Sequence, residues 1–125
     1  MNSVLVFEDD LISQELAKRA LQRLGISNIA FAANGSLGLK MLDSMEYQPN
    51  LIILDIFMPE KDGIEIVNAL VERKFKGGVV LVTGADLQYL HIAKTIAVGN
   101  GLQYLGWLSK PLSDEDLSRT LLRMN

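Results

Sequence analysis

The chain has 125 residues, the size of one ordinary globular domain, and its 49% apolar and 22% charged residues are close to the average of soluble proteins, which excludes intrinsic disorder. Fifteen acidic residues against twelve basic ones give a net charge of −3, so the chain has no bulk attraction for nucleic acid or for an anionic membrane. The absence of cysteine excludes disulfides, zinc–thiolate sites and thiol catalysis, and the single histidine excludes a multi-histidine metal site.

Targeting signals are also absent from the sequence. No apolar run approaches the roughly 18 residues that a membrane span needs. The first residues, Met1-Asn2-Ser3, lack the basic and apolar regions of a signal peptide. We therefore expect a cytoplasmic protein that binds neither nucleic acid nor membrane directly.

Five short apolar runs recur along the chain and are separated by longer amphipathic segments. Runs of four or five apolar residues that are rich in valine and isoleucine favour strands buried on both faces of a sheet. The expected strands are residues 4–7, 29–32, 51–54, 79–82 and 104–108.

The segments between these runs carry helix signals. Apolar residues four apart predict a first helix over residues 11–24 and an apolar stripe along it. The stripe consists of Ile12, Leu16, Ala20 and Leu24. Gly25 follows as a C-terminal cap, and Gly35 and Gly38 weaken the helix expected over residues 34–45 by about 1 kcal/mol each relative to alanine. N-terminal caps are expected at Asp10, Asp62, Asp86 and Ser113.

The order of these elements is strand then helix, repeated five times. Strict alternation with short connections predicts a parallel sheet with helices on both faces. A closed barrel of this kind needs more units than the chain has, so we expect an open, doubly wound α/β sheet. With the strand order 2-1-3-4-5, the first and third strands are neighbours at the switch point, where ligands bind beyond the carboxyl ends of the strands.

Polar residues follow four of the five runs, at what would be one edge of the sheet. They are Glu8-Asp9-Asp10, Asp55, Thr83 and Ser109-Lys110. If the first and third strands are neighbours, the carboxylates of Glu8, Asp9 and Asp55 converge. Thr83 then comes from the next strand and Lys110 from the strand beyond it.

Three converging carboxylates repel one another, and Lys110 supplies a single positive charge in return. A hard divalent cation would neutralise the negative charge that remains. Among such cations, Mg²⁺ prefers one or two carboxylates, several waters and phosphate oxygens as ligands. This preference indicates Asp9 and Asp55 as direct ligands and Glu8 as a ligand through water. The cation, the Lys110 ammonium and the Thr83 hydroxyl together would form an electrophilic clamp for a phosphoryl group.

With these residues in place, the sequence resembles the receiver domain of two-component response regulators over essentially its whole length. The motifs that carry the resemblance are Val6-Phe7-Glu8-Asp9-Asp10, Leu54-Asp55-Ile56-Phe57-Met58-Pro59, Asp62-Gly63, Val82-Thr83-Gly84 and Ser109-Lys110-Pro111. The Asp-x-x-Met-Pro and Lys-Pro motifs are specific when they occur together, in this order and at these separations. The resemblance implies a flavodoxin-like fold of the chemotaxis-regulator type and a single receiver domain over residues 1–125.

The resemblance also implies a role for each site residue. Asp55 would be the phosphoacceptor, whose carboxylate attacks the phosphorus of a phosphohistidine. Lys110 would pair with the phosphoryl oxygens. Mg²⁺ would be bound by Asp9, Asp55 and the backbone carbonyl of Phe57, and Glu8 would complete the acidic pocket.

Phosphorylation would then act as a switch. Thr83 would move toward the new phosphate, and the space that it leaves would admit an aromatic side chain of the fifth strand, which is Trp107. The readout face would be the fourth helix, fifth strand and fifth helix. The implied partners are a sensor histidine kinase or histidine phosphotransfer protein and a downstream effector. The domain would be no separate enzyme, but a phosphoacceptor that assists its own phosphorylation and dephosphorylation.

Three other functions compete with this one. A receiver fold used as a phosphorylation-independent binding module would have no need of the full set Glu8, Asp9, Asp55, Thr83 and Lys110. An aspartyl-phosphate hydrolase of the haloacid-dehalogenase type would have a second aspartate where this chain has Phe57. A dinucleotide-binding domain would have a glycine-rich turn after the first strand, where this chain has acidic residues.

Overall fold

The computed structural model describes residues 3–58, 60–84 and 86–124, so Met1, Asn2 and Pro59 of the motifs above lie outside it. Its strands are β1 (Ser3–Phe7), β2 (Asn28–Ala32), β3 (Leu51–Asp55), β4 (Gly78–Thr83) and β5 (Gln103–Ser109). Its helices are α1 (Leu11–Arg23), α2 (Gly35–Ser44), α3 (Gly63–Glu72), α4 (Leu87–Gly99) and α5 (Asp114–Leu121). Each expected strand is therefore confirmed, with ends that differ by at most one residue.

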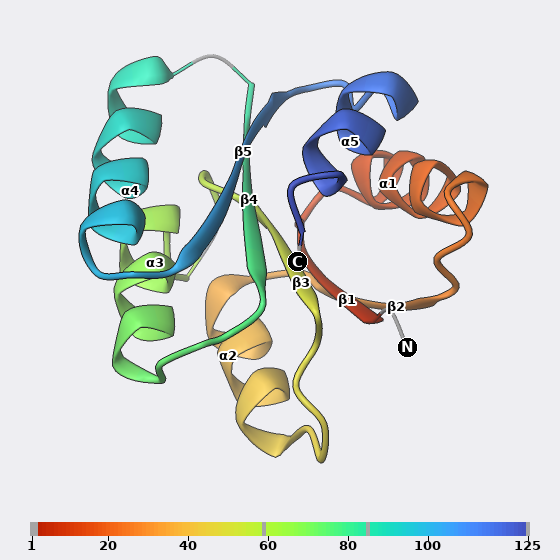
Figure 1. Cartoon of the computed structure of the whole chain (residues 1–125). Helices are drawn as coiled ribbons and strands as arrows, with labels where there is room; N and C mark the ends of the chain where they lie inside the picture. Colours follow the sequence, from red (N-terminus) through yellow and green to blue (C-terminus); the bar gives the residue numbers. More distant parts are fainter. Residues whose placement is uncertain (1–2, 59, 85, 125) are drawn as a thin grey trace.

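The strands pair in parallel in the order β2-β1-β3-β4-β5, as the alternation of strands and helices predicts. Helices α1 and α5 lie on one face of this sheet, and α2, α3 and α4 lie on the other (Figure 1). β1 and β3 are direct neighbours, with Phe7 opposite Leu54 in the register. The residues that follow these two strands are thus brought to the same edge of the sheet.

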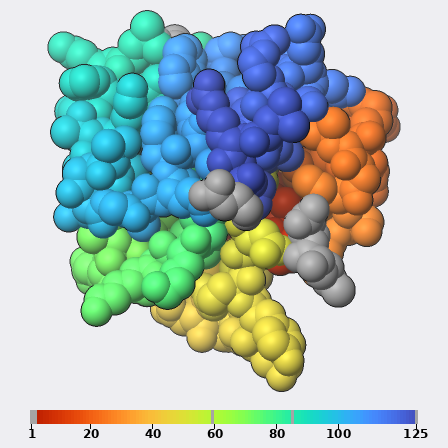
Figure 2. Space-filling view, viewed as in Figure 1, coloured from red at the N-terminus to blue at the C-terminus, as the bar shows by residue number. Residues whose placement is uncertain are grey.

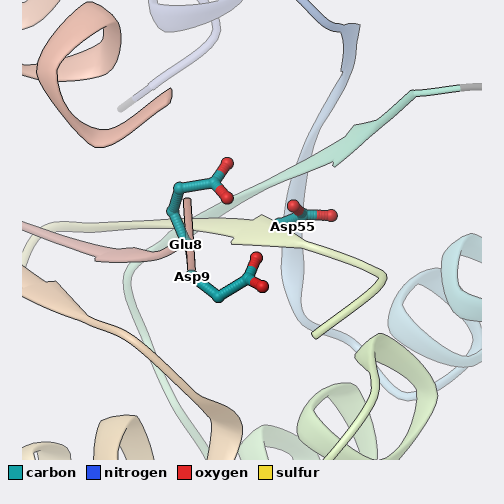
Figure 3. Close-up of side chains that lie close together, drawn as sticks. All are labelled: Glu8, Asp9 and Asp55. Carbon is teal, nitrogen blue, oxygen red and sulfur yellow. The ribbon is translucent and has the colours of Figure 1, made fainter. Parts of the chain in front are cut away.

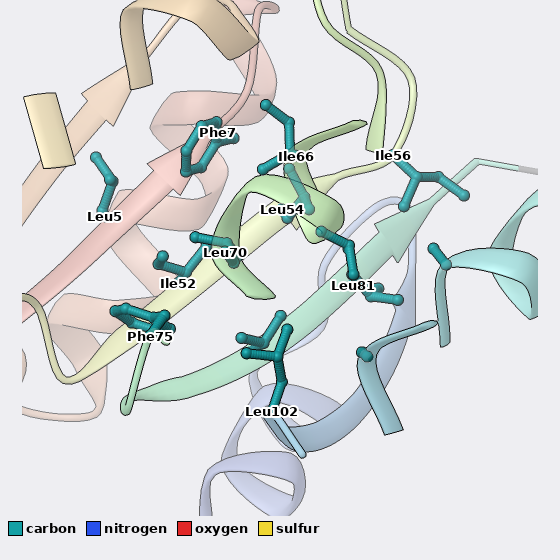
Figure 4. Close-up of a cluster of buried hydrophobic side chains, with 14 of the residues drawn as sticks. Leu5, Phe7, Ile52, Leu54, Ile56, Ile66, Leu70, Phe75, Leu81 and Leu102 are labelled. Carbon is teal, nitrogen blue, oxygen red and sulfur yellow. The ribbon is translucent and has the colours of Figure 1, made fainter. Parts of the chain in front are cut away.

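Two apolar cores fill the space between the sheet and its helices. The larger core contains Phe7, Leu54 and Leu81 and lies beneath α2, α3 and α4 (Figure 4). The smaller core lies under α1 and α5. Every residue of β3 and β4 is buried, which explains why these runs show continuous apolar character rather than alternation. Strands clamped on both faces hold the residues at their carboxyl ends in fixed positions.

The helix termini follow the predicted capping chemistry. An oxygen of the capping side chain accepts a hydrogen bond from the backbone N–H three residues on at Asp10, Asn34, Asp62, Asp86 and Ser113. Gly25 has a φ of 85°, and its N–H and that of Ile26 donate to the carbonyls of Gln22 and Leu21, which makes a Schellman motif at the end of α1.

The predicted apolar stripe of α1 is wrong at its N-terminal end. Ile12 is 71% exposed and Leu16 is 43% exposed, whereas Ala17 and Leu21 are buried together with the predicted Ala20. Residues spaced strictly four apart drift by about 40° per step around a helix of 3.6 residues per turn, so such a row leaves the core within three steps. The buried face instead follows mixed spacings of three and four residues.

Helix α2 keeps its two glycines because it packs very closely against its neighbours. A Cβ atom added to Gly38 would overlap the buried ring of Phe7, and one added to Gly35 would lie 2.6 Å from the Cβ atom of Lys61. The loss of helix propensity at these positions is therefore offset by close contact of α2 with β1 and with the segment before α3.

We expect Gly38→Ala to destabilise the domain by about 1–3 kcal/mol, because the overpacked Phe7 ring has no free space to move into. Gly99→Ala is the matched control, because Gly99 ends α4 and a Cβ atom there meets nothing within 4 Å. The control substitution is expected to stabilise the domain by about 0.4–1 kcal/mol. Urea unfolding measures both, and a neutral or stabilising Gly38→Ala would contradict the packing argument.

Candidate functional site

Three carboxylates meet at the carboxyl edge of the sheet, as the topology predicts. Glu8 and Asp9 follow β1, and Asp55 is the last residue of β3. One oxygen from each of the three lies within 4.8 Å of the others, and Figure 3 shows Glu8 and Asp9 reaching from the end of β1 toward Asp55. Carboxylate oxygens at this spacing are suitable ligands for a hard divalent cation.

Lys110, which directly follows the edge strand β5, joins this cluster. Its Nζ atom lies 2.6 Å from Asp55 Oδ2 and 2.7 Å from Glu8 Oε1. Its backbone N–H donates to the carbonyl of Thr83, which fastens the end of β5 to the end of β4. The predicted convergence of residues from the first, third and fifth strands is therefore present in the structure.

Burial divides the acidic residues into two kinds. Glu8 and Asp55 are each only 5% exposed, whereas Asp9 is exposed to solvent. Burial raises the pKa of Glu8, and the hydrogen bond from Lys110 opposes that shift only in part. Burial alone would lower the pKa of Lys110, but its hydrogen bonds to Asp55 and Glu8 outweigh this effect and raise it. The ammonium therefore stays charged, and it is paired with two of the three acids.

Backbone groups fix the orientation of both buried carboxylates. The N–H of Phe57 donates to Asp55 Oδ1 at 3.0 Å, and the N–H of Asp10 donates to Glu8 Oε2 at 3.1 Å. Asp55 therefore has one oxygen on the Phe57 peptide and the other on Lys110. A carboxylate with both oxygens held in this way presents a fixed geometry to an incoming electrophile.

A cavity of about 210 Å³ opens beside these groups. Glu8, Asp55 and Lys110 line it together with Leu16 of α1 and Leu112. A water occupies roughly 30 Å³ in the liquid, so a small anion with several waters fits in this volume.

Thr83 is the last residue of β4, and Trp107 lies in the neighbouring strand β5. The Thr83 side chain is 1% exposed, and its hydroxyl has no hydrogen-bond partner among the described residues. Trp107, which pairs with Leu81 in the register, is 44% exposed and faces outward. A buried hydroxyl without a protein partner is unfavourable, and such groups recur where a site is prepared for another ligand.

Two features of the site have no counterpart in the sequence predictions. The ring of Phe57 stacks on the ring of Tyr89 in α4. Ile12 and Leu16 expose apolar surface on α1, and Leu16 also lines the cavity. An aromatic residue three positions after the Asp86 cap was the available signal for the first feature, but it does not specify a partner ring.

The comparisons with known proteins agree with this geometry. The model of the response regulator receiver domain matches residues 4–122. The chain belongs to this family. Receiver domains are phosphoacceptor switches of two-component systems, whose partners include histidine kinases, and they generally bind Mg²⁺ in an acidic pocket such as the one formed here by Glu8, Asp9 and Asp55.

Individual relatives support the same assignment of the receiver domain. The chain is 33% identical over 119 residues to the probable C4-dicarboxylate response regulator DctR of Halalkalibacterium halodurans, an alignment that covers 94% of this chain and 49% of that protein. It is 39% identical over 83 residues to the corresponding protein of Bacillus subtilis, which covers 66% of this chain and 36% of that protein. The chain thus spans half or less of the length of these two relatives.

Solved structures show the same fold. The chemotaxis protein CheY4 of Vibrio cholerae superimposes with a TM-score of 0.80 at 27% identity, over 100% of this chain and 99% of that one. A response regulator from Colwellia psychrerythraea gives a TM-score of 0.77 at 30% identity, over 98% of this chain and 93% of that one. Within the described residues, no helix is both long and apolar enough to cross a membrane.

We expect Thr83→Val to stabilise the domain by about 1 kcal/mol, because it keeps the shape of the side chain and removes a buried hydroxyl that is not hydrogen-bonded within the described part of the chain. Thr120→Val is the matched control, since the Thr120 hydroxyl donates to the carbonyl of Asp116 at 2.8 Å. Thermal or urea unfolding should show a gain for the first variant and none for the second. Equal effects of the two substitutions would contradict the difference in hydrogen bonding between the Thr83 and Thr120 hydroxyls.

Proposed function

We propose that this chain, as a single receiver domain over residues 1–125, accepts a phosphoryl group on Asp55 from the phosphohistidine of a kinase or histidine phosphotransfer protein. The observation that carries the proposal is the Asp55 carboxylate, which is buried, held at both oxygens and placed beside two further carboxylates and an ammonium. An Asp55 oxygen attacks phosphorus, the P–N bond breaks, and the donor imidazole leaves with its electron pair. An aspartyl phosphate is the product.

Asp9 and Asp55 would hold Mg²⁺ together with the backbone carbonyl of Phe57, and Glu8 would act through water. When bound, the ion supplies positive charge that lets a phosphoryl group approach a carboxylate cluster. The exposure of Asp9 and the absence of any ion pair to it among the described residues support its role as an available ligand.

Lys110 then exchanges partners during the reaction. Formation of the acyl phosphate removes the negative charge from the attacking oxygen of Asp55 and places charge on the phosphoryl oxygens, so the ammonium is drawn toward the phosphoryl group. The Thr83 hydroxyl, which has no hydrogen-bond partner among the described residues, can donate to a phosphoryl oxygen. Both groups gain interactions only after transfer, which favours the phosphorylated conformation.

Movement of Thr83 would change the surface formed by α4, β5 and α5, where Trp107 lies. Figure 2 shows α4 in cyan and the β5 and α5 segments in blue as one continuous surface. We propose this surface as the readout face, with Thr83 and Trp107 as the switch residues and a downstream effector as the reader. Phosphorylation supplies the charge change, and the outward Trp107 is the side chain that changes place.

The exposed apolar side chains of α1 support the docking of a protein donor. Leu11 is 78% exposed and Ile12 is 71% exposed, and Leu16 both reaches the surface and lines the cavity beside Asp55. A protein that brings a histidine to Asp55 would cover this apolar area, whereas a small phosphodonor would not.

The Mg²⁺ and phosphoryl site is tested by the fluorescence of Trp107, the sole tryptophan of the chain. Wild type is expected to respond to Mg²⁺ and then to beryllium fluoride, a phosphoryl mimic. Asp55→Asn is expected to weaken Mg²⁺ binding by at least the roughly tenfold that even outer-shell substitutions cause. No response in wild type, or an undiminished response in Asp55→Asn, would count against the proposed function.

The docking surface is tested by comparing two phosphodonors. The protein donor is a phosphotransfer protein that phosphorylates the wild type. With this donor, Ile12→Asp is expected to slow phosphorylation roughly tenfold, whereas phosphorylation by acetyl phosphate is expected to stay unchanged. Leu122→Asp is the control, because Leu122 is 83% exposed but lies at the other end of the sheet beside Ser3. Equal slowing with both donors would place the defect in the site rather than in docking.

A further inference from the structure

The ring of Phe57 is held by a residue from a different part of the chain. Its centroid lies 4.9 Å from that of the Tyr89 ring, and the two planes are inclined by 25°, which is a stacked arrangement. Phe57 is 46% exposed and lies outside the two apolar cores, so this stack, rather than core packing, fixes its side chain. Stacked rings restrict each other more specifically than apolar contact alone.

Tyr89 is itself anchored at the start of α4. It is the third residue of α4, and its N–H donates to the Oδ1 atom of the Asp86 cap at 2.9 Å. Burial raises the pKa of the Tyr89 phenol to about 12, with a further contribution from a hydrogen bond with the carboxylate of Asp62, which caps α3. Tyr89 therefore connects the first turn of α4 to the loop that carries Phe57.

The peptide of Phe57 reaches the reacting group directly. Its N–H donates to Asp55 Oδ1 at 3.0 Å, and the peptide before it is held by a hydrogen bond from the Ile56 N–H to the carbonyl of Val82. The stack of the Phe57 ring on Tyr89 is a third contact that holds this short loop, in addition to these two hydrogen bonds. A shift of the Phe57 ring is therefore transmitted to an oxygen of Asp55 through one residue.

We propose that Tyr89 is a positioning residue of the Asp55 site, which through its stack on Phe57 preorganises the loop that orients Asp55 and presents the Phe57 carbonyl to a divalent cation. The inference rests on the proposed function, and it adds a residue of α4 to the determinants of cation and phosphoryl affinity. Preorganisation strengthens binding because the loop does not have to be ordered when the ligand arrives.

The same contact makes the coupling reciprocal. If the position of the first turn of α4 changes the affinity of the site for a cation or phosphoryl mimic, then occupancy of the site changes the position of that turn by the same free energy. This route to α4 runs through Phe57 and Tyr89 and does not involve Thr83.

The test measures Mg²⁺ affinity in the complete chain, by calorimetry and by the amide NMR shift of Phe57. Tyr89→Ala is expected to raise the dissociation constant roughly two- to tenfold, the range that an aromatic pair contributes. Tyr89→Phe keeps the stack and is expected to bind Mg²⁺ like wild type. Tyr47→Ala is the control, because Tyr47 is 81% exposed and lies at the opposite end of the sheet.

A double-mutant cycle isolates the stack. Phe57→Ala and Tyr89→Ala together are expected to weaken Mg²⁺ binding no more than either substitution alone, whereas additive losses would overturn the proposal. An unchanged dissociation constant in folded Tyr89→Ala, or a Tyr89→Phe variant as weak as Tyr89→Ala, would also overturn it. Failure of wild type to bind Mg²⁺ would refute the proposed function instead, so the two failures are distinguishable.

Discussion

The structure depends on one arrangement of charge, in which Lys110 pairs with the two buried carboxylates Glu8 and Asp55. Each carboxylate would be strongly unfavourable in its buried position without a cation, and two of them side by side repel each other. The ammonium reaches both because β5 ends level with β4, where Ser109 is paired with Thr83 and the Lys110 N–H donates to the Thr83 carbonyl. The pair of acids is therefore tolerated only when the outer strand is docked, which ties the site to the integrity of the whole sheet.

The sheet supplies this arrangement through its topology. Strand order 2-1-3-4-5 places the first and third strands side by side. The buried residues of these strands fix where each strand ends relative to the other. Acidic residues at the ends of two adjacent parallel strands have to converge, whatever the helices do. Glu8, Asp9 and Asp55 could therefore be placed together from their positions in the sequence. The strand limits and the capping residues could also be predicted, because they depend on local residue patterns.

Other features could not be read in advance, because they are decided by packing between distant segments. The face of α1 that is buried depends on the shape of the sheet and of α5, so the row through Ile12 and Leu16 had no fixed relation to the core. The stack of Phe57 on Tyr89 depends on where the loop after β3 lies relative to the first turn of α4. The Thr83 hydroxyl lacks a partner among the residues that the structure describes because of how its neighbours pack, and the residue types alone do not indicate this.

The charge balance shows how localised the acidic character is. Without Glu8, Asp9, Asp55 and Lys110, the chain has twelve acidic and eleven basic residues, so most of its excess negative charge belongs to one pocket. The remainder is nearly neutral and offers little long-range attraction to a cation, so affinity has to come from the local geometry of the ligands. A site of this kind is sensitive to small displacements of its loops. The contacts that hold the peptide of Phe57 are therefore as important to its chemistry as the carboxylates themselves.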